Sequence, residues 1–523
     1  MSTVDESVGL HWPKPEIVTI AQTRGEGKLK IYDGNNVEIT PETNICSSLK
    51  QNQFQTLRLV GEEPGEVELT VRYGNDKIVI AEDKVMVTVV ELDLRTDLDR
   101  DGTVEFDSDD DKTTEDAPWR FWINNDYDNI DADLKEEADL APNGVSDSAD
   151  KKISVKRDLE DFSILQLRPN GFSKKDIKSG KVECHLRFNP RLGGSIGSFD
   201  FNLFYFPKGS PAYLTDEGIA EKLVKDSEKL NIPNSDYYGE FIIDPKMFND
   251  DMEAVFLFEG KKAGRGAWTA KVFYDNSLVM EKELVHVEMR DIKDMYEHYT
   301  VGDFVSDANY PPSDIPSTYS RVGDFEYTGE SPEENDYILF VHGWRMQTWE
   351  RRAFAETSFK RLFWQGYKGR FGFFSWPTEW VDTNKWFDAA RDIRNYDRSE
   401  HKAWWSSHGL HKLLSDLDEK YPGKVRMFAH SMGNVVASEA LAIEAGSNSP
   451  RKFVHTYVAT QAATVAHAYD SAAETIFMNH ATTPEVYANY PGQPHENTLN
   501  CGTPSARLLT DNHYPILREV VLH

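Results

Sequence analysis

The sequence predicts a multi-domain protein in which all-β sandwich modules are followed by a C-terminal α/β domain. The chain has 523 residues, more than one ordinary hydrophobic core holds. Up to about residue 300, short alternating strand patterns are separated by turn residues. After residue 330, apolar strand runs alternate with long helical patterns, which is typical of a parallel sheet covered by helices.

The bulk composition narrows the possible partners. The formal net charge is −30 and the pI is near 4.9, which argues against nucleic acid and anionic membrane surfaces as partners. No apolar run is long enough to span a membrane, and the first residues lack the pattern of a signal peptide. The three cysteines have neither metal-ligand spacing nor a disulfide framework.

Residues 1–95 are expected to form an Ig-like β-sandwich module. Gly65–Val71 alternates apolar and polar residues, and Lys84–Val90 does so in part. The turn residues Gly74, Asn75 and Asp76 stand between these runs. Such modules serve more often for spacing or binding than for chemistry.

Residues 96–150 are strongly acidic and contain a pattern typical of a calcium loop. Oxygen-bearing side chains recur at alternate positions, namely Asp97, Asp99, Asp101, Thr103 and Glu105. Gly102 stands where such a loop turns sharply, and calcium prefers six to eight hard oxygen ligands. The twelfth position is Ser108 in place of the bidentate Glu of an EF-hand, so a solvated acidic turn is the alternative. A bound Ca²⁺ would be structural, and no cofactor is expected for catalysis.

The β pattern returns over residues 151–300, which we predict to be a second β domain. Phe162–Leu167, Val182–Phe188 and Trp268–Tyr274 are its clearest strands. Residues 301–330 are polar and Pro-rich and are expected to be a linker.

Residues 331–523 are predicted to form the α/β domain. The expected strands are Tyr337–Val341, Arg370–Phe374, Lys424–Ala429 and Lys452–Ala459. The expected helices are Trp349–Gln365, Asp397–Tyr421 and Ser431–Ala445. The alternation implies βαβ units and a parallel sheet with helices on both faces.

The strongest chemical signal is a serine between an apolar strand and a helix. The text Ala429-His430-Ser431-Met432-Gly433 has small residues two positions before and two after Ser431. Small neighbours allow the sharp, strained turn that exposes a nucleophilic hydroxyl above the sheet. The N-terminus of the following helix offers N–H groups and a positive dipole end to developing negative charge.

An earlier strand supplies the second signal. Tyr337–Val341 is followed by His342, Gly343 and Trp344. The loop after such a strand can provide a second oxyanion donor. Gly343 would let the backbone approach a substrate carbonyl. We expect the backbone N–H groups of Trp344 and Met432 to be the two donors.

These motifs resemble bacterial lipase/esterase-like α/β-hydrolases. The resemblance rests on Phe340–Trp344, Phe373–Pro377, Tyr396–Arg398 and Ala429–Asn434, and it covers roughly residues 330–470. It implies hydrolysis of acyl esters by a Ser-His-Asp triad, without naming a substrate. The acidic loop ahead of the hydrolase resembles large secreted bacterial versions of the family.

The triad partners should follow Ser431 in the order acid, then histidine. Asp470 and His513 are the predicted pair. Other carboxylates and histidines in this region stay open as alternatives, namely Glu474, Glu485, Glu496, Asp511, His455, His467, His480, His495 and His523. The last residues are poorly patterned for closing elements, so we expect the domain to be shortened or altered there, with weak activity if the base is missing.

Three functions follow from these residues. The first is a carboxylic-ester hydrolase acting on a small or lipid-like acyl ester, and the second is an amidase or thioesterase with the same nucleophile. The third is a calcium-stabilised surface or binding protein whose hydrolase domain is inactive. The acidic calcium-type modules favour an extracellular or periplasmic location.

Overall fold

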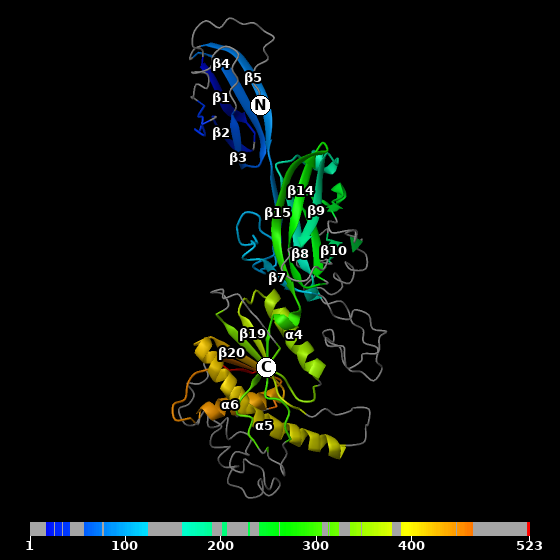
Figure 1. The fold of residues 1–523 in the computed structure, drawn as a ribbon, viewed down its shortest axis with the longest axis vertical. Helices are drawn as coiled ribbons and strands as arrows, with labels where there is room; N and C mark the ends of the chain where they lie inside the picture. Colours follow the sequence, from blue (N-terminus) through cyan, green and yellow to red (C-terminus); the bar gives the residue numbers. More distant parts are fainter. Residues whose placement is uncertain are drawn as a thin grey trace. The chain divides into compact units, whose positions relative to one another are not determined.

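The structure is a computed structural model, and it describes residues 17–25, 27–33, 35–41, 57–75, 78–123, 159–190, 201–206, 229–230, 240–260, 262–305, 312, 314–323, 335–346, 348–378, 389–445, 447–463 and 520–522. The chain divides into two compact units, each of which combines two segments. One unit contains residues 1–120 and 162–289, and the other contains residues 121–161 and 290–523. Figure 1 labels their helices and strands.

The N-terminal strands form two small sheets. Strands β1 (Ile17–Arg24), β4 (Gly65–Asn75) and β5 (Ile78–Val89) make a three-stranded antiparallel sheet. Strands β2 (Lys28–Tyr32) and β3 (Arg58–Glu63) form the second sheet. Ile20 of β1, Ile31 of β2 and Leu69 of β4 share one buried core, so side chains of both sheets meet.

Two five-stranded sheets follow, built mostly of antiparallel pairs. The first has the order β11 (Lys229–Leu230), β10 (Phe201–Tyr205), β13 (Ala254–Gly260), β8 (Ser163–Asn170) and β6 (Glu91–Arg95). The second has the order β12 (Glu240–Ile242), β9 (Val182–Pro190), β14 (Gly264–Tyr274), β15 (Ser277–Arg290) and β7 (Trp119–Trp122). The rings of Phe201 and Phe258 from the first sheet contact Trp268 of the second, which identifies the buried faces.

A seven-stranded sheet dominates the other unit. Its order is β17 (Ser320–Val322), β16 (Glu297–Thr300), β19 (Arg370–Ser375), β18 (Tyr337–Val341), β20 (Val425–His430), β21 (Thr456–Thr460) and β22 (Val520–Leu522). Only β17 pairs antiparallel within this sheet. The predicted class, β-sheet domains followed by an α/β domain, is confirmed.

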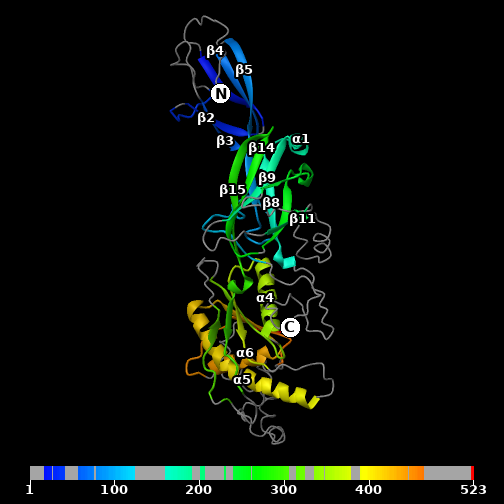
Figure 2. The same cartoon turned by 45° about the vertical axis from the view of Figure 1, so that its right-hand side comes forward.

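Alternate side chains of this sheet meet helices on opposite faces. Figure 2 shows the ribbons of α4, α5 and α6 around the sheet. On one face, Leu339 and Met427 pack in a core with α5 (Ala389–Lys420) and α6 (Gly433–Ala445). On the other face, Phe340 stacks on Phe354 of α4 (Thr348–Trp364), with 5.0 Å between ring centroids. This three-layer packing holds the carboxyl ends of the strands in a fixed arrangement.

The end of β7 and residues 159–161 pack on α4. Trp122 contacts Phe363 edge-on, at 5.0 Å between centroids, and its indole N–H donates to Asp161 at 2.6 Å. Asp161 also pairs with Lys360 of α4 at 2.6 Å, and both side chains are almost fully buried. These contacts explain why residues 121–161 belong to the same unit as the seven-stranded sheet.

Among the described residues, no helix has both the length and the apolar character that crossing a bilayer requires.

Candidate active site

Ser431 lies in a sharp turn at the carboxyl end of the central strands. Strand β20 ends at His430, helix α6 begins at Gly433, and Ser431 has a positive φ of 50°. This left-handed conformation costs a residue other than glycine about 1–2 kcal/mol. Ser431 is half-buried, whereas Met432 is fully buried. The turn is therefore strained and keeps the serine partly accessible, as a nucleophile elbow requires.

Glycines allow two loops to touch at the turn. A Cβ atom added to Gly343 would lie 3.0 Å from Ser431 Cβ and 2.8 Å from His430 Nδ1. A Cβ atom added to Gly433 would lie 2.4 Å from the carbonyl oxygen of His342. The loop after β18 therefore lies directly against the Ser431 turn, and any larger residue at either position would separate them.

Each predicted oxyanion donor directly follows one of the two residues in this contact: Trp344 follows Gly343, and Met432 follows Ser431. Within the described part of the chain, neither the Met432 N–H nor the Trp344 N–H donates to another described residue. By contrast, the Ser431 N–H donates to the Thr460 carbonyl at 3.0 Å, and the Arg345 N–H donates to Thr378 Oγ1 at 3.0 Å. The N–H groups of residues 432 and 344 are therefore not engaged by another described residue.

His342 is a structural residue of this loop and not a base. Its Nδ1–H donates to the Gly343 carbonyl at 2.7 Å, and its Nε2 accepts the Trp376 N–H at 3.1 Å. The indole N–H of Trp376 donates in return to the His342 carbonyl at 2.8 Å. Complete burial, followed by the charge of Arg351, holds the pKa of His342 well below its ordinary value. His342 is therefore neutral and already occupied at both nitrogens.

Two tryptophans at the ends of strands differ in burial. Trp376 follows β19 and is fully buried, so it packs in the core. Trp344 is half-buried and meets Tyr396 edge-on at 5.0 Å between centroids.

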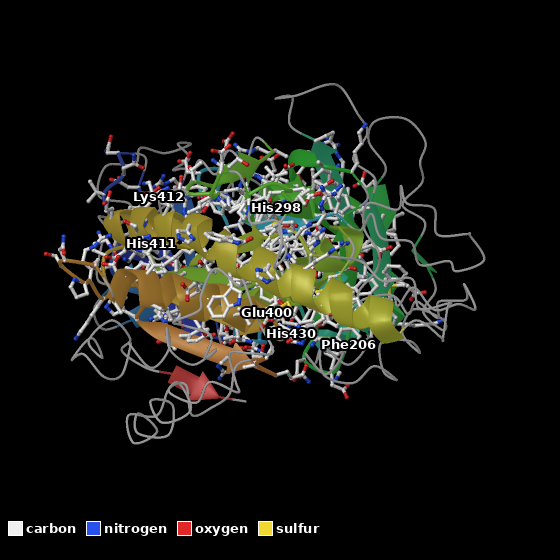
Figure 3. The ribbon with its side chains drawn as sticks, turned by 90° about the horizontal axis from the view of Figure 1, so that it is seen from below. Phe206, His298, Glu400, His411, Lys412 and His430 are labelled. Atoms are coloured by element: carbon white, nitrogen blue, oxygen red, sulfur yellow. The ribbon has the colours of Figure 1, made fainter. Side chains whose placement is uncertain are left out.

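His430 directly precedes Ser431 and hydrogen-bonds to a residue at the end of the next strand. Its Nε2 is 2.8 Å from Oε1 of Gln461, which follows β21 and also has a positive φ, of 43°. The ring of His430, which Figure 3 labels, stacks on Phe354 at 5.5 Å between centroids. Phe354 is 39% exposed.

The predicted acid and base, Asp470 and His513, lie outside the described residues. The structure does describe β22, which follows both of them in the chain. β22 pairs in parallel with β21, with Leu522 opposite Ala459, and Ala459 lies opposite Ala429 of β20. The carboxyl end of β22 therefore lies at the same edge of the sheet as the end of β20.

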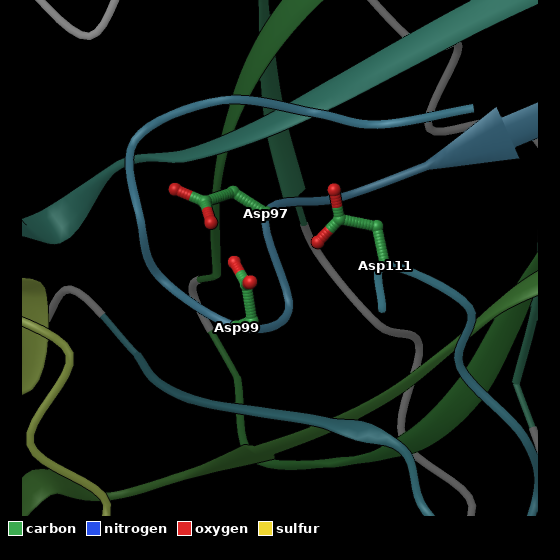
Figure 4. Close-up of side chains that lie close together, drawn as sticks. All are labelled: Asp97, Asp99 and Asp111. Carbon is green, nitrogen blue, oxygen red and sulfur yellow. The ribbon is translucent and has the colours of Figure 1, made fainter. Parts of the chain in front are cut away.

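The acidic loop in the β unit brings its side chains together in two overlapping groups. Oxygens of Asp97, Asp99 and Asp111, which Figure 4 shows, lie within 4.8 Å of one another. Oxygens of Asp99, Asp101 and Glu105 form the second group, within the same distance. Thr103 turns its hydroxyl toward Asp101 and Glu105. Asp111 was missed in the sequence because it lies beyond the twelve positions of the expected loop.

Backbone contacts hold this loop in shape. Gly102 has a φ of 95°, which suits the sharp turn expected there. Asp97 accepts the N–H groups of Asp101 and Gly102, both at 3.1 Å. Asp111 accepts those of Leu98 and Glu105, both at 2.7 Å. Each of these carboxylate oxygens accepts one of the N–H groups named here and still has a second lone pair that can bind a cation.

The carboxylates repel one another in a buried setting. Burial, followed by the charge of Asp111, raises the pKa of Asp97 to about 7. Burial also raises the pKa of Asp111 to about 6. A divalent cation would relieve this repulsion, and the all-oxygen donor set suits Ca²⁺.

Comparisons with known proteins found one family model and several solved structures. Residues 326–461 match a family model described as "Alpha/beta hydrolase of unknown function (DUF900)". The C-terminal domain has the α/β-hydrolase fold. No curated protein matches the chain.

Two solved structures are similar to parts of the chain at low identity. BcpA, the major pilin subunit of Bacillus cereus, has 9% identity and a TM-score of 0.20, with 57% of this chain and 74% of BcpA covered. The C-terminal domain of the Streptococcus agalactiae AgI/II polypeptide BspA has 12% identity and a TM-score of 0.19, with 52% and 84% covered.

Proposed function

We propose that the C-terminal domain is a serine hydrolase that cleaves carboxylic esters with Ser431 as its nucleophile. The observation that carries the proposal is the left-handed conformation of Ser431 at a strand-to-helix turn, with Gly343 packed against it. A strained serine is retained where strain positions a reactive group.

In the proposed reaction, Ser431 Oγ attacks the ester carbonyl while a histidine takes its proton. The N–H groups of Met432 and Trp344 stabilise the negative oxygen of the tetrahedral intermediate. The histidine then protonates the leaving alcohol, and water hydrolyses the acyl-enzyme by the same steps.

We propose a candidate for the base from the position of the last strand. His513 precedes β22 in the chain, whereas His523 directly follows it, and the carboxyl end of β22 lies at the edge that bears Ser431. This topology favours His523 over His513 as the base, with Asp470 as the orienting acid. The substitution His523→Ala should then abolish turnover and His513→Ala should not; the reverse pattern would restore the original assignment.

The substrate class is tested with matched p-nitrophenyl esters and p-nitroanilides of the same acyl groups. We expect ester cleavage by the wild type and none by Ser431→Ala. Cleavage of the anilides but not of the esters would favour the amidase alternative. A folded wild type that cleaves neither would favour the inactive, calcium-stabilised binding protein.

A second proposal concerns the acidic loop. We propose that Asp97, Asp99, Asp101, Glu105 and Asp111 hold a structural Ca²⁺, supported by the raised pKa values of the buried Asp97 and Asp111. Isothermal titration of the EDTA-treated full chain with CaCl₂ tests it. Saturable binding that MgCl₂ at equal concentration does not reproduce is expected, because Mg²⁺ demands a tighter octahedral site. Absence of heat would remove the proposal.

A further inference from the structure

We propose that Asn434 is a positioning residue that holds the strained Ser431 turn in its reactive shape. The inference rests on the proposed function of Ser431. Asn434 is the second residue of α6 and is fully buried. In a helix, an asparagine side chain usually caps an end or reaches water. Here it does neither and turns back toward the strands.

The side-chain amide of Asn434 links three carbonyl groups from two strand ends and the turn. Its Nδ2 donates to Ala429 at 3.1 Å, to Ser431 at 2.9 Å and to Thr460 at 3.3 Å. Two N–H bonds are thus shared among three acceptors. The amide spans the end of β20, the turn itself and the end of β21.

Tyr457 orients this amide. The phenol of Tyr457 donates to Asn434 Oδ1 at 2.6 Å, and Tyr457 is itself fully buried. Because the oxygen accepts from Tyr457, the nitrogen of the amide must face the carbonyl groups. The orientation of the amide is therefore set by a residue of β21.

The backbone of Ser431 is held at both its polar groups. Its N–H donates to Thr460, and its carbonyl accepts from the Asn434 N–H at 3.1 Å, the Ala463 N–H at 3.1 Å and the Asn434 side chain. A left-handed residue persists only where its surroundings over-determine it. The Asn434 side chain contacts the turn and both strand ends at once.

The test compares kcat and KM for Asn434→Ala, Asn434→Asp and the wild type on an ester substrate. Asn434→Ala should lower kcat about 10- to 100-fold with little change in KM, because small displacements of a reacting group cost that much. The control is Asn448→Ala, an exposed asparagine in the loop after α6. Thermal unfolding of each variant separates loss of positioning from loss of folding.

Asn434→Asp supplies a readout that a purely structural role would not move. The ionised aspartate keeps the shape but has no donor, and the protonated form regains one O–H. The ratio of kcat for Asn434→Asp to that of the wild type should therefore rise as pH falls, and the division cancels the titration of the base. The inference would be overturned if folded Asn434→Ala and Asn434→Asp both had wild-type kcat. It would also be overturned if Asn434→Ala had wild-type kcat and the kcat ratio of Asn434→Asp did not change with pH. An inactive wild type would instead overturn the proposed function.

Discussion

The imidazole of His342 lies parallel to the indole of Trp376, with 5.3 Å between ring centroids and 7° between ring planes. The two residues also exchange hydrogen bonds, so the loop that ends in Gly343 is fixed to the end of β19. Because Gly343 packs against Ser431, this pair sets the position of the loop beside the nucleophile.

The substitution Trp376→Phe should therefore lower both stability and turnover. It keeps ring stacking but removes the bond to the His342 carbonyl, which should cost about 1–2 kcal/mol of unfolding free energy. We expect kcat to fall several-fold as well. Trp364→Phe is the matched control. The indole of Trp364, at the end of α4, donates to the Glu160 carbonyl at 2.8 Å, away from the Ser431 turn. Equal effects of the two variants on kcat would contradict this account.

Replacing Ser431 by glycine and by alanine should separate strain from chemistry. Both variants lose the hydroxyl and should be inactive. Ser431→Gly relieves the left-handed strain, partly offset by the added freedom of the unfolded chain, so it should be more stable than Ser431→Ala by up to about 1 kcal/mol. Urea denaturation of both measures the difference. A more stable alanine variant would show that the turn is not strained.

Asp111→Asn should reduce the stabilisation by calcium in the β unit. Asp111 is fully buried in the carboxylate cluster, whereas Asp107 is exposed. Removing one charged ligand should weaken Ca²⁺ binding about tenfold or more. The rise in melting temperature on adding CaCl₂ after EDTA should therefore shrink in Asp111→Asn and persist in Asp107→Asn. A calcium response that neither substitution alters would place the ion elsewhere.

His298 should make the stability of the hydrolase unit depend on pH. Burial, followed by the charges of Arg352 and Arg351, lowers the pKa of His298 to about 4. Between pH 6.5 and 4, the unfolded chain binds a proton at this residue that the folded chain does not. The contribution is thus present above pH 6.5 and is lost as pH falls, by up to about 1.4 kcal/mol per pH unit.

The substitution His298→Phe should flatten this dependence, because the ring can still stack on Phe373, which lies 4.8 Å away between centroids. Denaturant unfolding at several pH values from 7.5 to 4.5 measures the slope. Identical slopes for the two proteins would show that His298 titrates normally.

The elements around the site were predictable because local patterns determine them. The strand Tyr337–Val341 has the predicted bounds, and α4 and α6 differ from their predicted bounds by at most two residues. The start of α5 at Ala389, earlier than the predicted Asp397, was missed because its first turns are polar. The turn at Ser431 was also predictable from local sequence, because the small residues on both sides of Ser431 indicate it.

Contacts between distant residues were not predictable. Asn434 reaches Thr460, and Trp376 reaches His342, across 26 and 34 residues respectively. These pairs meet only because β21 and β19 lie beside their neighbours in the sheet. Asp111 and Asp97 also meet only in the folded protein, because the loop between them turns the chain back. A single sequence carries no period or motif for such contacts.

The central claim is tested most directly by labelling the full chain with a fluorophosphonate probe and locating the adduct by peptide mass spectrometry. The account predicts one adduct on Ser431, none after Ser431→Ala, and slower labelling after Asn434→Ala. A folded wild type that takes up no probe, or an adduct on another serine, would contradict the claim that residue 431 is an activated nucleophile.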